Sequence, residues 1–107
     1  MNFDKNTFKK SISLIIGCIY EDIKSTEKLI NSLKGNVFFL KEVIIVFNNV
    51  NNNEKINFIS KLKIPKDLCK SLVFKKRLMP GEARNIGIYE SKGEFIAFLD
   101  ASTFPED

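Results

Sequence analysis

Residues 81–100 read GEARNIGIYESKGEFIAFLD, and the expected fold follows from this stretch. Its first part, Glu82–Lys92, predicts a helix because apolar residues recur there at helical spacing. Gly93 lies just past the expected helix end, where glycine is favoured. Residues 94–99 are mostly apolar, which predicts a strand that leads into a polar loop at Asp100. A helix followed directly by such a strand is typical of an α/β domain with a parallel sheet.

The rest of the chain repeats this alternation of strands and helices. Apolar runs predict strands at Ile12–Ile19, Val43–Phe47 and Leu72–Phe74, and helical spacing predicts helices at Asp22–Lys34 and Lys55–Lys63. The asparagine-rich run Asn48–Asn53 predicts a loop, because asparagine favours turns. We therefore expect a Rossmann-like, three-layer α/β/α fold with a mainly parallel sheet of about four strands and right-handed crossovers. Ligands of such sheets bind at the carboxyl ends of the strands.

Composition excludes several classes of function. The chain has 107 residues, a net charge of +4 and no histidine, which excludes Ser-His-Asp catalysis and histidine-based metal sites. Its densest basic run, Lys75–Arg77, is short, so we expect a solvated basic surface and no nucleic-acid partner. Cys18 and Cys69 indicate reduced intracellular thiols rather than a disulfide framework.

Hydropathy bears on where the protein resides. No segment approaches the roughly 20 apolar residues that a membrane-spanning helix needs, so we expect no transmembrane segment. We predict a cytoplasmic protein, with peripheral association with the inner face of the membrane as an open alternative.

Three motifs in residues 81–100 together resemble those of family-2 glycosyltransferases of the GT-A type. In that family A-R-N-x-G opens a helix, K-G-E follows it, and a hydrophobic strand ends in F-L-D-x-D. Here the motifs are matched in order by Ala83–Gly87, Lys92–Glu94 and Phe98–Asp100. Residues 13–16 and 42–46 are similar, more loosely, to the family's first two strands. The resemblance covers most of the chain, and its specific part is the last third.

The resemblance implies a binding site for a nucleotide-sugar donor. The candidate donor-binding residues lie in or beside the loops that follow the expected strands, or at the start of the last helix: Asp100, Arg84, Ser102, Asn85, Asn48 and Tyr20. Asp100 is the candidate ligand of a divalent cation, Mn²⁺ or Mg²⁺, which would bridge the donor phosphates. Arg84 could bind a phosphate or form an ion pair with Asp100, and both alternatives place it beside the donor.

The chain departs from the family motifs at the predicted site. The D-x-D motif reads Asp100-Ala101-Ser102, and a serine hydroxyl is a poor substitute for a carboxylate, so we expect weakened metal binding. Phe47 or Asn48 stands where the family has an acidic residue; Phe47 could pack or stack on a base, and Asn48 could accept a hydrogen bond. Tyr20 falls where the family commonly has asparagine.

Two residues of the A-R-N-x-G motif suggest structural roles. Asn85 could hydrogen-bond loop backbone near the site, and Gly87 would allow close packing of the helix on a strand. Neither role requires contact with a substrate.

The family's acceptor-binding part and catalytic base lie downstream of the D-x-D loop. We therefore expect residues 1–107 to be a single nucleotide-sugar-binding domain that is incomplete, with its catalytic residue unknown. The implied activity is sugar transfer from a nucleotide-sugar to a glycan or lipid-linked acceptor, in surface polysaccharide or glycan synthesis. The alternative is a non-catalytic module that acts as a subunit or interaction domain, in which uncovered apolar surface favours a homo-oligomer.

Overall fold

The computed structural model describes residues 9–100, and in them strands and helices alternate as predicted. The strands are β1 (Ile12–Ile19), β2 (Leu40–Asn48), β3 (Cys69–Phe74) and β4 (Phe95–Asp100), and the α-helices are α1 (Ile23–Asn31), α2 (Asn52–Ser60) and α3 (Pro80–Glu90). Short 3-10 helices precede α1, β2 and β3, at Tyr20–Asp22, Val37–Phe39 and Lys66–Leu68. None of the helices in this part of the chain is long and apolar enough to cross a membrane.

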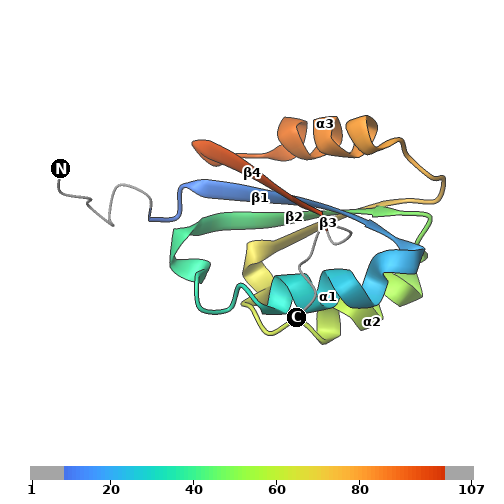
Figure 1. Cartoon of the computed structure of the whole chain (residues 1–107), viewed down its shortest axis with the longest axis horizontal. Helices are drawn as coiled ribbons and strands as arrows, with labels where there is room; N and C mark the ends of the chain where they lie inside the picture. Colours follow the sequence, from blue (N-terminus) through green and yellow to red (C-terminus); the bar gives the residue numbers. More distant parts are fainter. Residues whose placement is uncertain (1–8, 101–107) are drawn as a thin grey trace.

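The strands form one parallel sheet in the order β3-β2-β1-β4. Helices α1 and α2 cover one face of the sheet and α3 covers the other (Figure 1), which makes three layers. The predicted Rossmann-like α/β fold is therefore confirmed. The chain builds outward from β1 to β3 and then returns to place β4 on the other side of β1. Such a reversal leaves a crevice at the carboxyl ends of the two strands, here β1 and β4.

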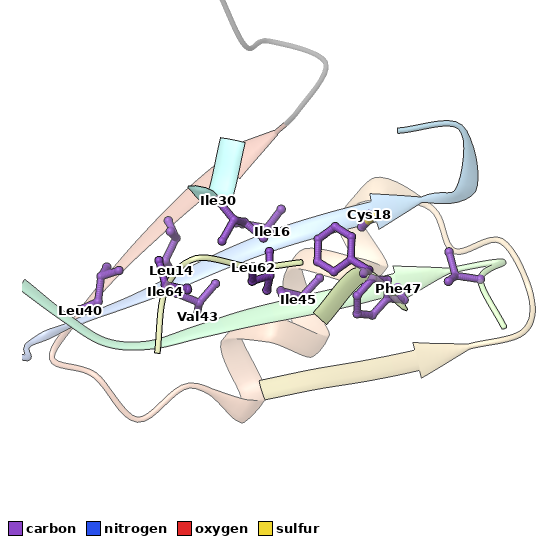
Figure 2. Packing of buried hydrophobic residues seen from close by; sticks show 12 residues of the cluster. Leu14, Ile16, Cys18, Ile30, Leu40, Val43, Ile45, Phe47, Leu62 and Ile64 are labelled. Carbon is purple, nitrogen blue, oxygen red and sulfur yellow. The ribbon is translucent and has the colours of Figure 1, made fainter. Parts of the chain in front are cut away.

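The larger core lies between the sheet and helices α1 and α2. Alternate side chains of β1 and β2 point to this face, where they meet Ile30 of α1 and Phe58 of α2 (Figure 2). Phe47 is fully buried in this core, and its ring packs edge-on against Phe58 with the ring centroids 5.3 Å apart. Burial on both faces explains the continuous apolar runs of the central strands β1 and β2, whereas β3 is half-buried and β4 is largely exposed.

The smaller core lies between the sheet and α3. It holds Ile15, Ile44 and Val46 from the strands, packed against Leu78 and Ala83. A Cβ atom at Gly87 would overlap the side chain of Ile15, so only glycine lets α3 approach β1 this closely. The predicted packing role of Gly87 is confirmed.

Several boundaries differ from the prediction: strands β2 and β3 each begin three residues earlier, at Leu40 and Cys69, and two helices begin earlier than predicted. The predicted loop Asn48–Asn53 is too long, because α2 already begins at Asn52. Asn51 caps this helix, since its side chain accepts a 2.8 Å hydrogen bond from the Glu54 N–H and its own N–H donates back to Glu54 over 2.9 Å. The predicted last helix begins at Pro80 rather than at Glu82, because proline suits the first turn of a helix.

Helix α1 is also shorter than predicted. It runs from Ile23 to Asn31, ends before Gly35, and receives no capping hydrogen bond from the Asp22 side chain. The preceding residues Tyr20–Asp22 form a 3-10 turn, which brings the chain from the end of β1 to the helix.

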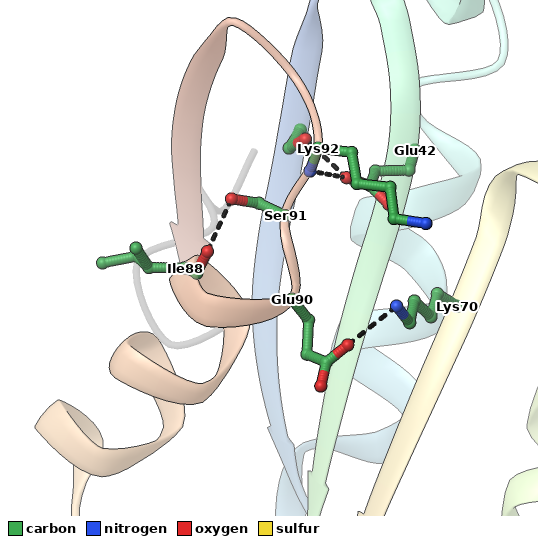
Figure 3. Close-up of polar contacts among 7 residues, drawn as sticks. Glu42, Lys70, Ile88, Glu90, Ser91 and Lys92 are labelled. Carbon is green, nitrogen blue, oxygen red and sulfur yellow. Dashed lines mark hydrogen bonds and ion pairs between the residues drawn. The ribbon is translucent and has the colours of Figure 1, made fainter.

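A polar cluster fastens the α3–β4 connection to the amino ends of β1 and β2. The buried Ser13 hydroxyl donates to Glu42 over 2.7 Å and accepts from the Gly93 N–H over 2.7 Å. Glu42 also accepts from the Lys92 N–H over 2.6 Å (Figure 3). A Cβ at Gly93 would lie 2.6 Å from the Ser13 hydroxyl, so the connection needs glycine there. The Lys92–Glu94 motif thus serves the fold, at the opposite end of the sheet from the strands' carboxyl ends.

Candidate functional site

A cleft of about 540 Å³ opens at the carboxyl ends of β1, β2 and β4, beside the start of α3. Its charged and polar lining residues are Asp22, Asn48, Arg77, Arg84 and Asp100, and its remaining walls are Gly17 and the apolar side chains around it. The cleft therefore lies at the strand ends that the topology predicts.

The structure brings only some of the predicted site residues to this cleft. Asp100, Arg84 and Asn48 line it. Asn85 lies on the exposed side of α3, and Tyr20 lies in the turn after β1 with 56% of its surface exposed; neither lines the cleft. Ser102 lies outside the described residues.

Strand register explains how the floor of the cleft is made. Gly17 of β1 pairs with Asp100 of β4 on one side and with Val46 of β2 on the other. Because alternate residues of a strand share a face, Gly17 follows Ile15 onto the α3 face. A Cβ at Gly17 would have its nearest neighbour at 3.9 Å, in Ala83. An added Cβ would thus make ordinary van der Waals contact with Ala83, and Gly17 itself adds no side chain to the cleft floor beside its register partner Asp100.

Arg84 enters the cleft from α3. Its guanidinium carbon lies 5.6 Å from the ring centre of Phe98, which is two residues before Asp100 on the same strand. This is a cation–π arrangement, and it holds the positive charge over β4. The alternatives that the sequence left open for Arg84, a phosphate contact or an ion pair with Asp100, both remain predictions.

Asn48 has a structural role in the wall of the cleft. Its side chain is 4% exposed, and its oxygen accepts a 2.8 Å hydrogen bond from the Leu78 N–H. The hydrogen bond ties the β3–α3 connection to the end of β2. Phe47 points instead to the α1 and α2 face, so of its two predicted roles the packing role is confirmed.

Arg77 and Asp22 line the cleft and were not identified from the sequence. Arg77 belongs to the basic run that was interpreted as solvated surface, and Asp22 was placed at the start of the predicted helix Asp22–Lys34. Both residues lie in connections that follow strands. They could have been found from the rule that ligands bind at the carboxyl ends of parallel strands.

The carboxylates of the cleft suit a cation that is bound jointly by protein and ligand better than a cation that is bound by protein side chains alone. Asp22 and Asp100 line the same cleft, while no group of three or more potential metal ligands occurs within residues 9–100. Mg²⁺ typically binds one or two carboxylates and completes its octahedral shell with water and substrate phosphates. Asp22 and Asp100 are the carboxylates of the described lining that could hold such an ion, and metal binding stays a prediction.

Comparison with protein-family models identifies the chain's relatives. The model of Glycosyl transferase family 2 matches residues 13–107, from the first strand to the last residue. The chain belongs to glycosyl transferase family 2. Among curated proteins, none gives a significant match.

Membership of glycosyl transferase family 2 supports a glycosyltransferase-like function in general. The three family motifs lie in two different parts of the fold, at the cleft and at the opposite end of the sheet. The first helical motif places Ala83 and Arg84 in the cleft, and the strand motif brings Asp100 to it. The motif between them holds the opposite end of the sheet through Gly93.

Proposed function

We propose that the cleft binds the diphosphate of a nucleotide-sugar and that the protein takes part in sugar transfer to a glycan or lipid-linked acceptor. The observation that supports the proposal is the pairing of Asp100 with Gly17, which places Asp100 in the cleft beside a residue without a side chain, at the switch point of the sheet. Arg84 supplies a positive charge in the same cleft. A site with these charges suits an anionic donor whose leaving diphosphate needs stabilisation.

Asp100 is the proposed ligand of a Mn²⁺ or Mg²⁺ ion that is held jointly with the donor phosphates. Such an ion would offset the negative charge that develops on the diphosphate as the sugar leaves. With serine at the second motif position, we propose that the ion binds weakly without nucleotide and tightly with it.

Calorimetry tests the proposal with UDP, GDP and CDP, each with and without Mn²⁺. We expect binding of at least one nucleotide, strengthened by Mn²⁺, and we expect Asp100→Asn to abolish the Mn²⁺ effect. Glu94→Gln is the matched control, because Glu94 is an exposed acidic residue near the other end of β4. Absence of binding by all three nucleotides and by their sugar conjugates would refute the proposal.

A second candidate function is a non-catalytic module that acts as a subunit or interaction domain. It is favoured by apolar side chains of β4, an edge strand of the sheet in the described residues, and of α3. Phe95, Ile96, Phe98 and Ile88 are each at least 40% exposed. Light scattering tests this alternative: a homo-oligomer that persists in Asp100→Asn and binds no nucleotide would support it, and a monomer at high concentration would contradict it.

The place of action remains a prediction. A glycan or lipid-linked acceptor in surface polysaccharide synthesis is consistent with a cytoplasmic protein at the inner face of the membrane. Fractionation of cells that express the protein, with and without a high-salt wash, would test whether it associates peripherally with membranes.

A further inference from the structure

Arg77 brings a second guanidinium to the cleft from a connection whose backbone is firmly held. It precedes Leu78, whose N–H donates to Asn48, and the Met79 N–H donates to Glu82 over 2.9 Å. On the other side of the connection, the Asn49 N–H donates to the Phe74 carbonyl over 2.9 Å. The backbone around Arg77 is thus fixed to β2 and α3, while its side chain is 64% exposed.

The partner of Arg77 is a carboxylate from across the carboxyl edge of the sheet. Glu21, in the turn after β1, lies with its carboxylate oxygen 3.8 Å from an Arg77 guanidinium nitrogen. This distance is too long for a hydrogen bond. Both side chains are more than half exposed, and ion pairs of this kind contribute about 0–1 kcal/mol. The pair is therefore easily exchanged for a stronger ligand.

The two guanidinium groups of the cleft indicate the class of that ligand. Arg77 and Arg84 line the cleft together with the carboxylates Asp22 and Asp100. Arg84 is also engaged by the ring of Phe98. A diphosphate offers several anionic oxygens, and guanidinium groups bind such oxygens in pairs of short, charge-assisted hydrogen bonds. It would thus outcompete a single carboxylate held at 3.8 Å.

We propose that Arg77 is a second phosphate-binding residue of the donor cleft and that Glu21 is the counter-ion which the donor displaces. The proposal rests on the proposed function, because it assigns a further residue to the same ligand. It implies that Glu21 weakens donor binding, since its attraction to Arg77 must be given up on binding. Donor affinity would then depend on an exchange of partners by Arg77.

The test is a double-mutant cycle, measured by calorimetry with Mn²⁺ and the nucleoside diphosphate that the unmodified protein binds best. We expect Arg77→Gln to weaken binding about tenfold or more, as loss of a charge-assisted hydrogen bond would. We expect Glu21→Gln to strengthen binding about twofold to fivefold, in keeping with a weak surface ion pair. In the double variant, the gain from removing Glu21 should vanish, because Arg77 is no longer present to be released.

Two controls make the result specific. Lys76→Gln removes a neighbouring exposed charge that does not line the cleft, and it should change the affinity less than twofold. The nucleoside monophosphate should lose less affinity than the diphosphate when Arg77 is replaced. Thermal melts of every variant should match the unmodified protein, since the replaced side chains are exposed.

The possible failures are distinguishable. Unchanged affinity of Arg77→Gln, with binding to the unmodified protein intact, overturns the assignment of Arg77 and leaves the proposed function standing. A Glu21→Gln variant that binds no better, or the same gain in the Arg77→Gln background, overturns the counter-ion role. If the unmodified protein binds none of the nucleotides, the proposed function fails and this proposal fails with it.

Discussion

The side-chain oxygen of Asn48 and the backbone N–H of Leu78 are joined by a 2.8 Å hydrogen bond that is buried at the edge of the cleft. This contact links the end of β2 to the connection that carries Arg77. A buried N–H that loses its acceptor costs about 1–3 kcal/mol. The Asn48 side chain is therefore one of the groups that hold the β3–α3 connection in position.

Asn48→Ala should lower the free energy of unfolding by about 1–3 kcal/mol, as measured by urea denaturation. It should also weaken nucleotide binding by the proposed site, because the wall that carries Arg77 loosens. Asn57→Ala is the matched control: Asn57 is exposed on α2, and its replacement should change stability by less than about 0.5 kcal/mol. Equal stability of the two variants would contradict the role assigned to Asn48.

Substitution of Gly17 should weaken ligand binding without lowering the stability of the fold. An added Cβ there would make ordinary van der Waals contact with Ala83, 3.9 Å away, so it would overlap no neighbour. We expect Gly17→Val to melt at or above the temperature of the unmodified protein, since valine favours strands. Its nucleotide affinity should fall at least about tenfold because the side chain fills the cleft floor, and Gly17→Ala should fall in between. Unimpaired binding by Gly17→Val would place the ligand elsewhere.

Substitution of Gly87, unlike that of Gly17, should lower the stability of the fold. Gly87→Ala should destabilise the protein by about 1–2 kcal/mol, because overlap with Ile15 outweighs the better helix propensity of alanine. Gly81→Ala, in the same helix, has nothing within 4 Å of its added Cβ and should be neutral or stabilising. The comparison is made by chemical denaturation, and a stabilised Gly87→Ala variant would show that α3 can move away from β1.

Ser13 is expected to stabilise the fold without affecting the cleft. Ser13→Ala leaves the Gly93 N–H and the Glu42 carboxylate without the hydroxyl they share, so the free energy of unfolding should fall by about 1–3 kcal/mol. Nucleotide affinity of the folded variant should stay unchanged. Ser25→Ala, at an exposed position of α1, should alter neither quantity. A clear loss of affinity in Ser13→Ala would mean that the two ends of the sheet are coupled.

Cys18 gives the protein a specific pH dependence. Burial raises the pKa of its thiol from 9.0 to about 11, so the folded state keeps the proton that the unfolded state releases. The stability due to this group is therefore present below pH 9 and is lost as the pH rises towards 11. The slope should reach about 1.4 kcal/mol per pH unit. Denaturation between pH 8.5 and 11 should show a shallower slope for Cys18→Ala; identical slopes would contradict the assignment.

Sequence periodicity sufficed to predict the order of strands and helices and the position of Asp100 at a strand end. An apolar run followed by polar residues is a local pattern, and it marks both a strand and its end. Periodicity did not suffice for Asn52 and Asn53, where a capping box with Glu54 turned a loop-like composition into a helix start. Local capping hydrogen bonds here outweighed residue preference.

The candidate site was predictable where a family motif falls at a strand end, as at Asp100, or at the start of a helix, as at Arg84. Arg77 and Asp22 could not be found in this way, because their place in the cleft depends on long-range packing of connections. The role of Asn48 likewise depends on Leu78, which is 30 residues away along the chain. Asn48 and Leu78 meet because the β3–α3 connection crosses the edge of the sheet. No local sequence pattern predicts where this connection crosses.

The strand order has a consequence for how the protein folds. The first strand pairs with the last one described, so the pairing of Gly17 with Asp100 closes a loop of almost the whole described chain. Contacts between residues so distant in sequence form slowly, after the local β1-α1-β2 unit has formed. We expect β4, an edge strand in this part of the chain, to open more readily than the central strands β1 and β2. A ligand bound in the cleft should then slow hydrogen exchange in β4 most of all.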